Sequence, residues 1–452
     1  MESRMESYHR NYNGGRQSRS DSRGRGRGRS TSRGRGRSAT VSKSFQQKHL
    51  AVRISSDVVD IPHGVDNYML ENFLTLKNRL NASKNKLDAL YDKKITTEKD
   101  QKNIIYFQSL VDLYKPMRMK IQKEYNGKMV TNAWMKYWEI YHHYKLIPEQ
   151  SDRKFLAFFN AELPGAAINA FNHFMKTARP GMEFDWRASS LAPGTIETTN
   201  TDILGDKYGL FARNRDKWLM TLPGEKGREN NGDVTNFANL EDFARLVGPD
   251  SPLGGVDLYS HDAGIDASDD YNNQETSNAR IHLGCALSGF MTLRVGGAFI
   301  AKQYTLFESF TWNLIIIYAQ LFDEFYLSKP LTSRPFNSEI YLIGIGFRGL
   351  PDATKDLLSE RLMNFSMKPF IPIDAVKVRL SETSSDIERF ARIVFTQQQK
   401  FIEENVRLYD SYKNRLPALK IGLQSITQDL INDWMKKYPV GKISDADQVL
   451  TN

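Results

Sequence analysis

The sequence predicts an α/β protein with a mostly parallel, doubly wound sheet, helical regions on both sides of it in the chain, and an N-terminal tail. Three observations support this class. Between residues 130 and 350, short apolar segments alternate with helical ones, as in α/β units. Before and after this stretch, apolar residues recur at helical spacing. The first 45 residues contain almost no aliphatic side chain.

The tail, residues 1 to 45, repeats Arg-Gly and Arg-Ser (RGRGRGRS, then RGRGRS). It cannot bury enough apolar surface to offset its chain entropy, so we expect it to be disordered. Its first 40 residues hold eleven arginines against three acidic residues, so this segment accounts for nearly all of the net charge of +9. Arginines spaced by glycine favour non-specific RNA binding, with Arg25, Arg27 and Arg29 as contacts. A solubility or localisation tail is the alternative.

Three further regions follow the tail. With 452 residues, the chain exceeds what one hydrophobic core usually holds. We predict a helical N-terminal region over residues 46 to 128, the α/β domain over 129 to 350 and a helical C-terminal region over 351 to 452. In the C-terminal region the pattern predicts helices over about 383 to 410 and 415 to 437.

The composition excludes several classes of protein. A single cysteine, Cys285, rules out an intrachain disulfide or a cysteine-based zinc site and is typical of a reducing compartment. No apolar run approaches the roughly 18 to 20 residues of a membrane span, and no signal peptide is visible. We therefore expect a soluble intracellular protein without a metal. For two groups of polar residues we favour solvated or packed side chains over metal ligands: Asp266, Asp269 and Asp270, and His142, His143 and His173.

Charged residues stand where strand-like runs end or begin. Asp262 follows the run VDLYSH, Lys302 closes RVGGAFIAK, and Glu339 precedes IYLIGIGF. Asp233, in NNGDVTNF, is also expected at a strand end. Because the carboxyl ends of parallel strands form the usual binding edge of such a sheet, we expect these side chains to lie near one another. Packing alone does not explain charges at these positions.

A turn after the first strand of the domain suggests where a ligand binds. The run FLAFFNAELPGAAINAF is apolar as far as Glu162, turns through Pro164 and Gly165, and then opens a helix with small residues. Such a turn lets the backbone approach a ligand at the carboxyl end of the strand. By itself, such a turn favours a plain strand-to-helix connection, and only the neighbouring motifs shift the interpretation toward a ligand site.

Taken in order, these motifs resemble the FtsJ-type (RrmJ-type) ribose 2′-O-methyltransferases, and within them the Adrift-type branch of eukaryotic and viral cap methyltransferases. The resemblance covers residues 130 to 350, about half of the chain, and implies a Rossmann-like methyltransferase sheet. It rests on AWMKYWEI, ELPGAAINAFNHFM, DWRASSL, DKYGLF, GDVTNF, the Asp262 turn, GGAFIAKQYTLFES and KPLTSRPFNSEIYLIGIGF.

The resemblance also implies functional residues. The catalytic Lys-Asp-Lys-Glu tetrad of the family falls on Lys136, Asp262, Lys302 and Glu339. For the first lysine Lys145 is the alternative, and the context AWMKYWEI favours Lys136. The implied pocket for S-adenosylmethionine is formed by Pro164, Gly165, Trp186, Asp233 and Asp262, and the implied RNA-facing loop by Lys329, Ser333 and Arg334. This chain departs from the family's pattern at Glu162, Ala166, His261 and Ala263, which bears on fine placement of the donor.

These residue types suit ribose methylation. A ribose hydroxyl is a poor nucleophile, so methyl transfer from a sulfonium needs a base and accurate in-line placement. Burial and a second ammonium group nearby both favour the neutral form of a lysine, which is how Lys136 would make Lys302 a proton acceptor. Asp262 and Glu339 would orient the two lysines, although their negative charge opposes that effect.

We therefore expect an S-adenosylmethionine-dependent RNA 2′-O-methyltransferase that modifies a cap-proximal ribose of messenger RNA. Its expected partner is the capped RNA 5′ end, with partner subunits of a capping or virion complex as a further possibility. The flanks and the basic tail are typical of proteins of large cytoplasmic DNA viruses, which favours the cytoplasm, a viral factory or a virion. The alternatives are a non-catalytic RNA-binding or scaffold subunit of such a complex, and a basic-tailed nucleocapsid protein.

Overall fold

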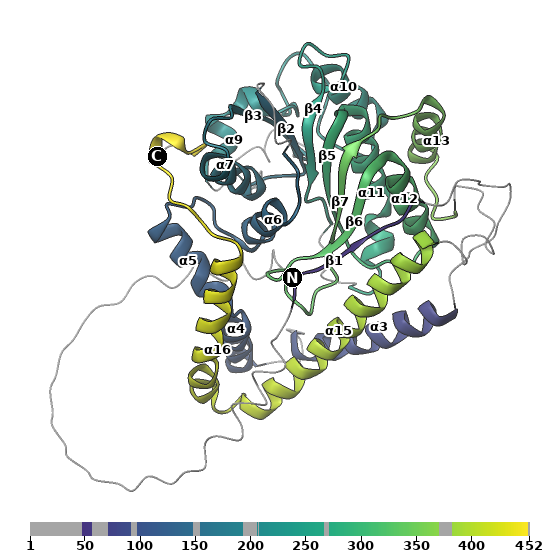
Figure 1. Ribbon diagram of the computed structural model, residues 1–452. Coiled ribbons are helices and arrows are strands. Elements are labelled where there is room, and N and C mark those ends of the chain that lie inside the picture. The colour runs from purple at the N-terminus through teal and green to yellow at the C-terminus, as the bar shows by residue number, and fades with distance from the viewer. Residues whose placement is uncertain are drawn as a thin grey trace, which may run out of the picture.

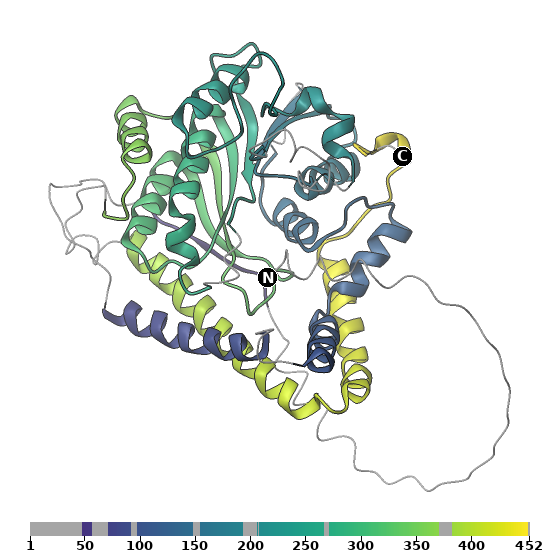
Figure 2. The ribbon, with the colours of Figure 1, turned by 180° about the vertical axis from the view of Figure 1, so that it is seen from behind.

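The computed structural model describes residues 48–56, 71–91, 97–147, 154–192, 206, 208–265, 271–369 and 382–450. Two predictions fall outside these residues: the disordered tail with its contacts Arg25, Arg27 and Arg29, and the acidic group at Asp266, Asp269 and Asp270. The described chain folds around one twisted sheet with helices on both of its faces (Figures 1 and 2).

The sheet has seven strands in the order β1-β6-β7-β5-β4-β2-β3. Strands β3, β2, β4 and β5 are parallel neighbours, whereas β7 is antiparallel to both β5 and β6, and β1 is antiparallel to β6 at the edge. This arrangement confirms the predicted α/β class and the mostly parallel sheet. The strands are β1 Leu50–Arg53, β2 Phe155–Asn160, β3 Phe184–Ser189, β4 Val256–His261, β5 Leu293–Gln303, β6 Phe322–Lys329 and β7 Ile340–Phe347.

Side-chain alternation along the strands divides the core into two layers. Phe158 of β2 packs in one hydrophobic cluster, while its neighbours Ala157 and Phe159 pack in the other. Helices α6 (Asn132–His143) and α7 (Ala166–Ala178) supply the second cluster. Helices α10 (Phe237–Val247), α11 (Gln274–Thr292) and α12 (Ser309–Leu321) supply the first, as does α13 (Asp352–Met363). The two faces are thus covered by different helices (Figure 1).

The flanking regions pack as pairs of helices beside this core. Helix α3 (Glu71–Tyr91) lies along α15 (Glu382–Tyr412), and α4 (Glu98–Val111) lies along α16 (Leu416–Lys437), as Figures 1 and 2 show. Helix α5 (Lys115–Glu124) leads into α6. The predicted C-terminal helices are confirmed. Among the described residues, none of the helices combines the length and the apolar character that a membrane span requires.

The N-terminal region is helical as predicted, with one correction. Before α3, the segment Leu50–Arg53 forms strand β1 and extends the sheet beside β6. Four residues are too few to show a clear alternating pattern in the sequence, although Val52 is buried and Arg53 is exposed. The division of the chain at residues 129 and 350 stays a prediction, and both flanks pack against the sheet domain.

The carboxyl edge of the sheet gathers most of the predicted charged residues. Strand β4 ends beside β5 with His261 opposite Ala301, and β5 ends with Gln303 opposite Ile340, the first residue of β7. Asp262, Lys302 and Glu339 therefore share one edge. Asp233 was wrongly expected at a strand end, because it lies in the loop that leads into α10. Earlier in the same connection between β3 and β4, Trp218 makes an isolated bridge to Ala188 of β3.

Candidate active site

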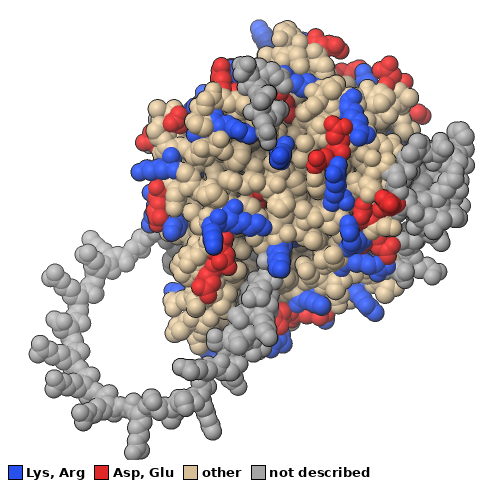
Figure 3. All heavy atoms as spheres, viewed as in Figure 1, with Lys and Arg blue, Asp and Glu red and all other residues tan. Residues whose placement is uncertain are grey.

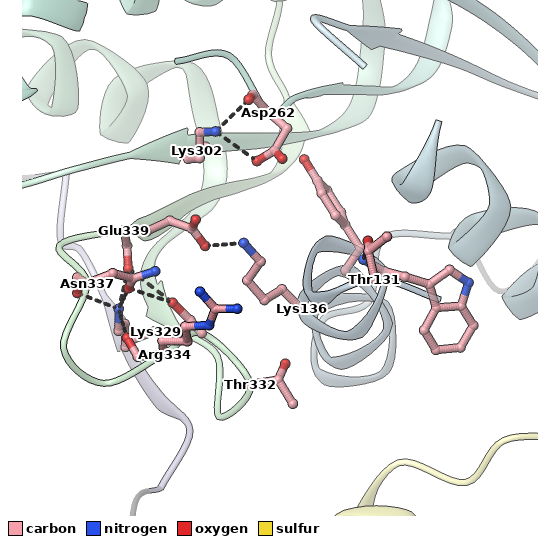
Figure 4. A network of polar contacts seen from close by, with 12 residues as sticks. Thr131, Lys136, Asp262, Lys302, Lys329, Thr332, Arg334, Asn337 and Glu339 are labelled. Carbon is pink, nitrogen blue, oxygen red and sulfur yellow. Dashed lines mark hydrogen bonds and ion pairs between the residues drawn. The ribbon is translucent and has the colours of Figure 1, made fainter. Parts of the chain in front are cut away.

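Lys136 lies inside the protein because its helix crosses the carboxyl edge. Helix α6 begins after Thr131, whose hydroxyl accepts a hydrogen bond from the backbone N–H of Trp134. The Lys136 side chain is 1% exposed, and its Nζ donates to Glu339 Oε1 at 2.6 Å (Figure 4). The other candidate lysine, Lys145, follows the end of α6 and is exposed. The structure therefore brings Lys136, and not Lys145, to Glu339.

Lys302 forms the second lysine–carboxylate pair. Its Nζ donates to the backbone carbonyl of Asp262 at 2.6 Å and lies 3.4 Å from Asp262 Oδ1. The Lys302 and Asp262 side chains are 10% and 21% exposed, so this pair is more open than that of Lys136 and Glu339. Both pairs lie at the same edge of the sheet, and each bridges two different segments of the chain (Figure 4).

The other ionisable side chains near Lys302 add little net charge to the site. His261 and His282 are both buried, and burial together with the charge of Lys302 holds their pKa values below the ordinary range, that of His282 at about 3. Burial, followed by the negative charge of Asp262, raises the pKa of Glu162 well above the usual value. Both histidines are therefore neutral near pH 7, and the ionic groups at this edge are mainly the two pairs.

Glu162 also fixes the turn after β2, where a methyl donor is expected. Its Oε1 accepts a hydrogen bond of 2.6 Å from the backbone N–H of Ala167, in the first turn of α7. Gly165 just before that helix has φ +107°, and a Cβ there would lie 2.1 Å from Leu210 Cδ2. Only glycine fits this turn without strain. The predicted glycine is thus placed as expected, on a turn that ends at the carboxyl edge.

Two of the other predicted pocket residues contact neighbouring side chains of the protein, and their roles toward a donor stay predictions. Trp186 is 2% exposed and packs edge-on against Trp218 in the core, so its ring presents no open face to a ligand. Asp233 is partly exposed, and its Oδ1 accepts hydrogen bonds from the backbone N–H and the hydroxyl of Thr235. Pro164 precedes Gly165 in the turn after β2.

The residues of this edge nevertheless fit a bound donor. Among the described residues, the buried hydroxyl of Ser189, at the end of β3, has no hydrogen-bond partner. Beside it, Gly232 has φ +79°, and a Cβ there would lie 2.1 Å from the carbonyl oxygen of Ser190. A buried polar atom without a partner calls for a ligand or a water molecule. The turn after β2 lies next to this position, because the backbone N–H groups of Glu162 and Leu163 donate to the Ser189 carbonyl and the Ser190 hydroxyl, and Asp233 follows Gly232 directly. A pocket for a polar nucleoside needs such polar groups around it.

The predicted RNA-facing loop needs a correction at two of its three residues. Lys329 is 4% exposed, and its Nζ donates to Asn337 and, at 2.6 Å, to the carbonyl oxygen of Glu339. Ser333 is fully buried, and its hydroxyl contacts the same carbonyl. Neither side chain faces RNA. The sequence suggested exposure because basic and hydroxyl-bearing residues in a loop are usually solvated. In the structure, Lys329 and Ser333 point inward and contact the carbonyl oxygen of Glu339.

Arg334 is partly buried, and it shares its carboxylate partner with Arg118, a residue that the sequence analysis missed. Arg334 and Arg118 of α5 both pair with Asp112, at 3.8 Å and 2.9 Å. Arg118 also contacts the side chain of Asn132, at the start of α6. The Asp112 carboxylate therefore links α5 to the loop that precedes β7. No sequence signal joined Arg118 to this site, because α5 lies outside the recognised motifs.

Over the wider surface the charges are mixed. In the view of Figure 3, Lys and Arg side chains are interspersed with Asp and Glu side chains. This distribution agrees with a net charge that is concentrated in the first 40 residues. Within the described residues, no group of three or more His, Cys, Asp or Glu side chains is arranged to hold a metal ion.

Comparison with known proteins gives the family. The model of the FtsJ-like methyltransferase family matches residues 129–347. A protein of African swine fever virus named "Probable methyltransferase EP424R" is 35% identical over 354 residues, which are 78% of this chain and 79% of that protein. A cap-specific mRNA (nucleoside-2′-O-)-methyltransferase 2 of Mus musculus is 29% identical over 75% of this chain and 42% of its own length. Protein L511 of Acanthamoeba polyphaga mimivirus, which is uncharacterized, is 27% identical over 74% of this chain and 40% of its own.

Proposed function

The chain belongs to the FtsJ-like methyltransferase family, and from this premise we propose that it transfers a methyl group from S-adenosylmethionine to the 2′ hydroxyl of a cap-proximal ribose in messenger RNA. The observation that carries the proposal is the pair of lysine–carboxylate contacts at one edge of the sheet, Lys136 with Glu339 and Lys302 with Asp262. The cap is supported by the similarity to the mouse enzyme, whose name specifies that substrate.

The donor would lie at the ends of β2 and β3. Gly165, Ser189, Gly232 and Asp233 would hold it there, and Asp262 would border it from the end of β4. S-adenosylmethionine, when bound, supplies an electrophilic methyl group on a sulfonium. Glu162, which is neutral when its raised pKa exceeds the ambient pH, adds no second negative charge beside Asp262.

In the proposed mechanism, Lys302 accepts the proton of the ribose hydroxyl. Its Nζ lies at the carboxyl edge, held by Asp262 on one side, and it must be neutral when the hydroxyl attacks. As O2′ took the methyl group that a bound donor would supply, with the thioether as leaving group, Lys302 Nζ would take the proton of O2′. The buried pair of Lys136 and Glu339 provides a fixed dipole that helps to orient the hydroxyl without solvent reorganisation.

RNA would bind at the carboxyl edge of the sheet, next to the loop between β6 and β7. Arg334 and Arg118 lie there with one shared carboxylate, so they can contact phosphates of the strand. The arginine-glycine tail would raise the local concentration of RNA without selecting a sequence. Because relatives of the chain are viral proteins, we place its action in the cytoplasm, at a viral factory or in a virion, where subunits of a capping complex would be partners.

The test is methyl transfer from radiolabelled S-adenosylmethionine to short capped and uncapped RNAs, with nuclease mapping of the labelled ribose. Lys302→Ala should abolish transfer while leaving donor binding near normal, and Lys136→Ala should reduce it strongly. The exposed Lys145→Ala is the matched control and should retain activity.

The outcomes separate the alternatives. Label on the first or second ribose of capped RNA alone supports the cap assignment, and label elsewhere redirects the proposal to another RNA. Retained activity in Lys302→Ala would refute the assigned base. Absence of label, together with RNA binding, would favour the non-catalytic scaffold subunit.

A further inference from the structure

Glu139 is a buried carboxylate on the same helix as Lys136, three residues further on. Residues three apart on a helix lie on the same side of it, so Glu139 faces the same part of the structure as Lys136. Its side chain is fully buried. Among the described residues, the one basic side chain recorded within ion-pair distance of it is His49, whose Nδ1 lies 3.4 Å from Glu139 Oε2. A buried carboxylate must be satisfied by hydrogen bonds, which indicates that its donors are specifically placed.

Three of these donors, from two residues, belong to the loop between β6 and β7. Glu139 Oε2 accepts from the backbone N–H of Leu331 at 2.6 Å. Glu139 Oε1 accepts from the backbone N–H of Thr332 at 2.8 Å and from its hydroxyl at 2.6 Å. This loop ends at Glu339, the partner of Lys136. One helix therefore holds the loop near its start through Glu139 and at its end through Lys136.

Hydrogen bonds within the loop between β6 and β7 also hold its two ends together. Lys329 donates to the carbonyl oxygen of Glu339 at 2.6 Å and to the side chain of Asn337 at 2.7 Å. With both ends of the loop tied to each other and to α6, the Glu339 carboxylate has little freedom to turn away from Lys136. Displacing Leu331 and Thr332 would therefore move the segment that presents Glu339.

The remaining donors come from the two flanks of the chain. The indole Nε1 of Trp434, in α16, donates to Glu139 Oε1 at 3.0 Å. His49, just before β1, contacts Glu139, the hydroxyl of Ser328 and the hydroxyl of Tyr438. Four segments that lie far apart in the chain, around residues 49, 139, 332 and 434, thus meet at one carboxylate.

We propose that Glu139 is a positioning residue through which the C-terminal helix α16 and the segment before β1 hold the pair of Lys136 and Glu339 in its working geometry. This inference rests on the proposed function for its effect on catalysis. Its structural part, the control of the Lys136 environment by Glu139 and Trp434, stands independently of that function. The flanks are then part of the catalytic apparatus and not only supports for the fold.

The test uses the full chain with two variants, Glu139→Gln and Trp434→Phe. Glutamine keeps the shape but offers one acceptor oxygen where the carboxylate has two. Phenylalanine keeps most of the ring packing and removes the indole N–H. The matched control is Trp312→Phe, because the Trp312 indole is also buried, donates at 2.9 Å to the carbonyl of Leu306, and lies in the other hydrophobic cluster.

The first measurement is steady-state methyl transfer. Both variants should lower kcat by about 10- to 100-fold, which corresponds to the loss of one or two well-placed hydrogen bonds to a charged group. The KM for S-adenosylmethionine should stay within about twofold, because the donor site lies at β2 and β3. The control should keep its kcat despite a comparable loss of melting temperature. Unchanged kcat in both variants would overturn the proposal.

The second measurement does not depend on activity. Acetic anhydride labels accessible amines, and mass spectrometry reports the labelling rate of each lysine. Lys136, which is 1% exposed and ion-paired, should be protected in the wild type and in Trp312→Phe. Its labelling rate should rise at least about fivefold in Glu139→Gln and Trp434→Phe. An unchanged rate would refute the positioning role even if the wild type proved to be no methyltransferase, whereas an increased rate in an inactive protein would refute the proposed function alone.

Discussion

Removing one partner of the buried pair of Lys136 and Glu339 should destabilise the protein strongly. Their side chains are 1% and 6% exposed, and the Nζ–Oε1 distance is 2.6 Å. In Lys136→Met the methionine fills much of the space but leaves the Glu339 carboxylate buried without its cation. Loss of one partner from such a buried pair costs about 3–5 kcal/mol. We expect that loss in the free energy of unfolding, measured by urea denaturation followed through tryptophan fluorescence.

The double variant Lys136→Met/Glu339→Gln measures the coupling free energy between the two charged groups, apart from their contacts with other residues. With both charges removed, no buried charge is left uncompensated, so the double variant should recover about 2–4 kcal/mol relative to the sum of the two single changes. Lys102→Met is the control, because the pair of Lys102 and Glu98 is largely exposed and should show no measurable loss. Additive single changes, or a loss in Lys136→Met below about 1 kcal/mol, would show that the two groups are not coupled as the structure indicates.

Further predictions concern the donor turn, the buried histidine and RNA binding. Gly165→Ala should weaken S-adenosylmethionine binding at least tenfold in calorimetric titration because φ is +107° there, whereas Gly181→Ala, with open space around its Cβ position, should not. Burial lowers the pKa of His282 from 6.5 to about 3, so the unfolded state binds a proton on this ring more tightly than the folded state does. The contribution of neutral His282 to the free energy of unfolding is therefore complete above pH 6.5 and is lost as the pH falls toward 3. The loss amounts to about 4–5 kcal/mol, so His282→Gln should flatten the decline of stability between pH 6.5 and 3 in acid titration, and an unchanged profile would contradict the assignment. Arg334→Gln should raise the KM for RNA and reduce the slope of log affinity against log salt by about one, while the same slope in the wild type and the variant would exclude a phosphate contact. Deletion of residues 1–45 should weaken RNA binding in filter assays chiefly at low salt, and equal weakening at high salt would argue against an electrostatic role.

The elements that the sequence predicted well are those whose signal is local. The apolar runs that end at Asp262 and Lys302, and the one that begins just after Glu339, have a strand-like character and a charged residue at one end, so both the strands and their shared edge could be inferred. The helices of the flanks follow from helical spacing in the same way. Strand β1 was missed because four residues carry too little periodicity, and its place in the sheet depends on pairing with β6.

The errors concern side chains whose environment is decided by distant segments. Lys329 and Ser333 are polar residues in a loop, which in sequence indicates exposure, but the carbonyl oxygen of Glu339 draws both inward. For Trp186 the sequence could not show the packing against Trp218, which lies 32 residues away in the chain, and its role in the donor pocket stays a prediction. Glu139 gave one usable signal, its spacing of three from Lys136. That spacing could suggest a shared face of the helix but could not reveal that α16 supplies one of its donors.

The two lysine–carboxylate pairs differ in burial, and this difference bears on their proposed roles independently of family resemblance. The pair of Lys136 and Glu339 is almost sealed, so a substrate hydroxyl could reach it only if the loop after β6 moved. The pair of Lys302 and Asp262 is partly open and stands between strand ends that face the expected donor position. A proton acceptor must touch the hydroxyl it deprotonates, whereas a fixed dipole can act without contact and acts more strongly where water is excluded. Burial therefore favours Lys302 as the base and leaves Lys136 and Glu339 as the fixed charges that orient the reaction.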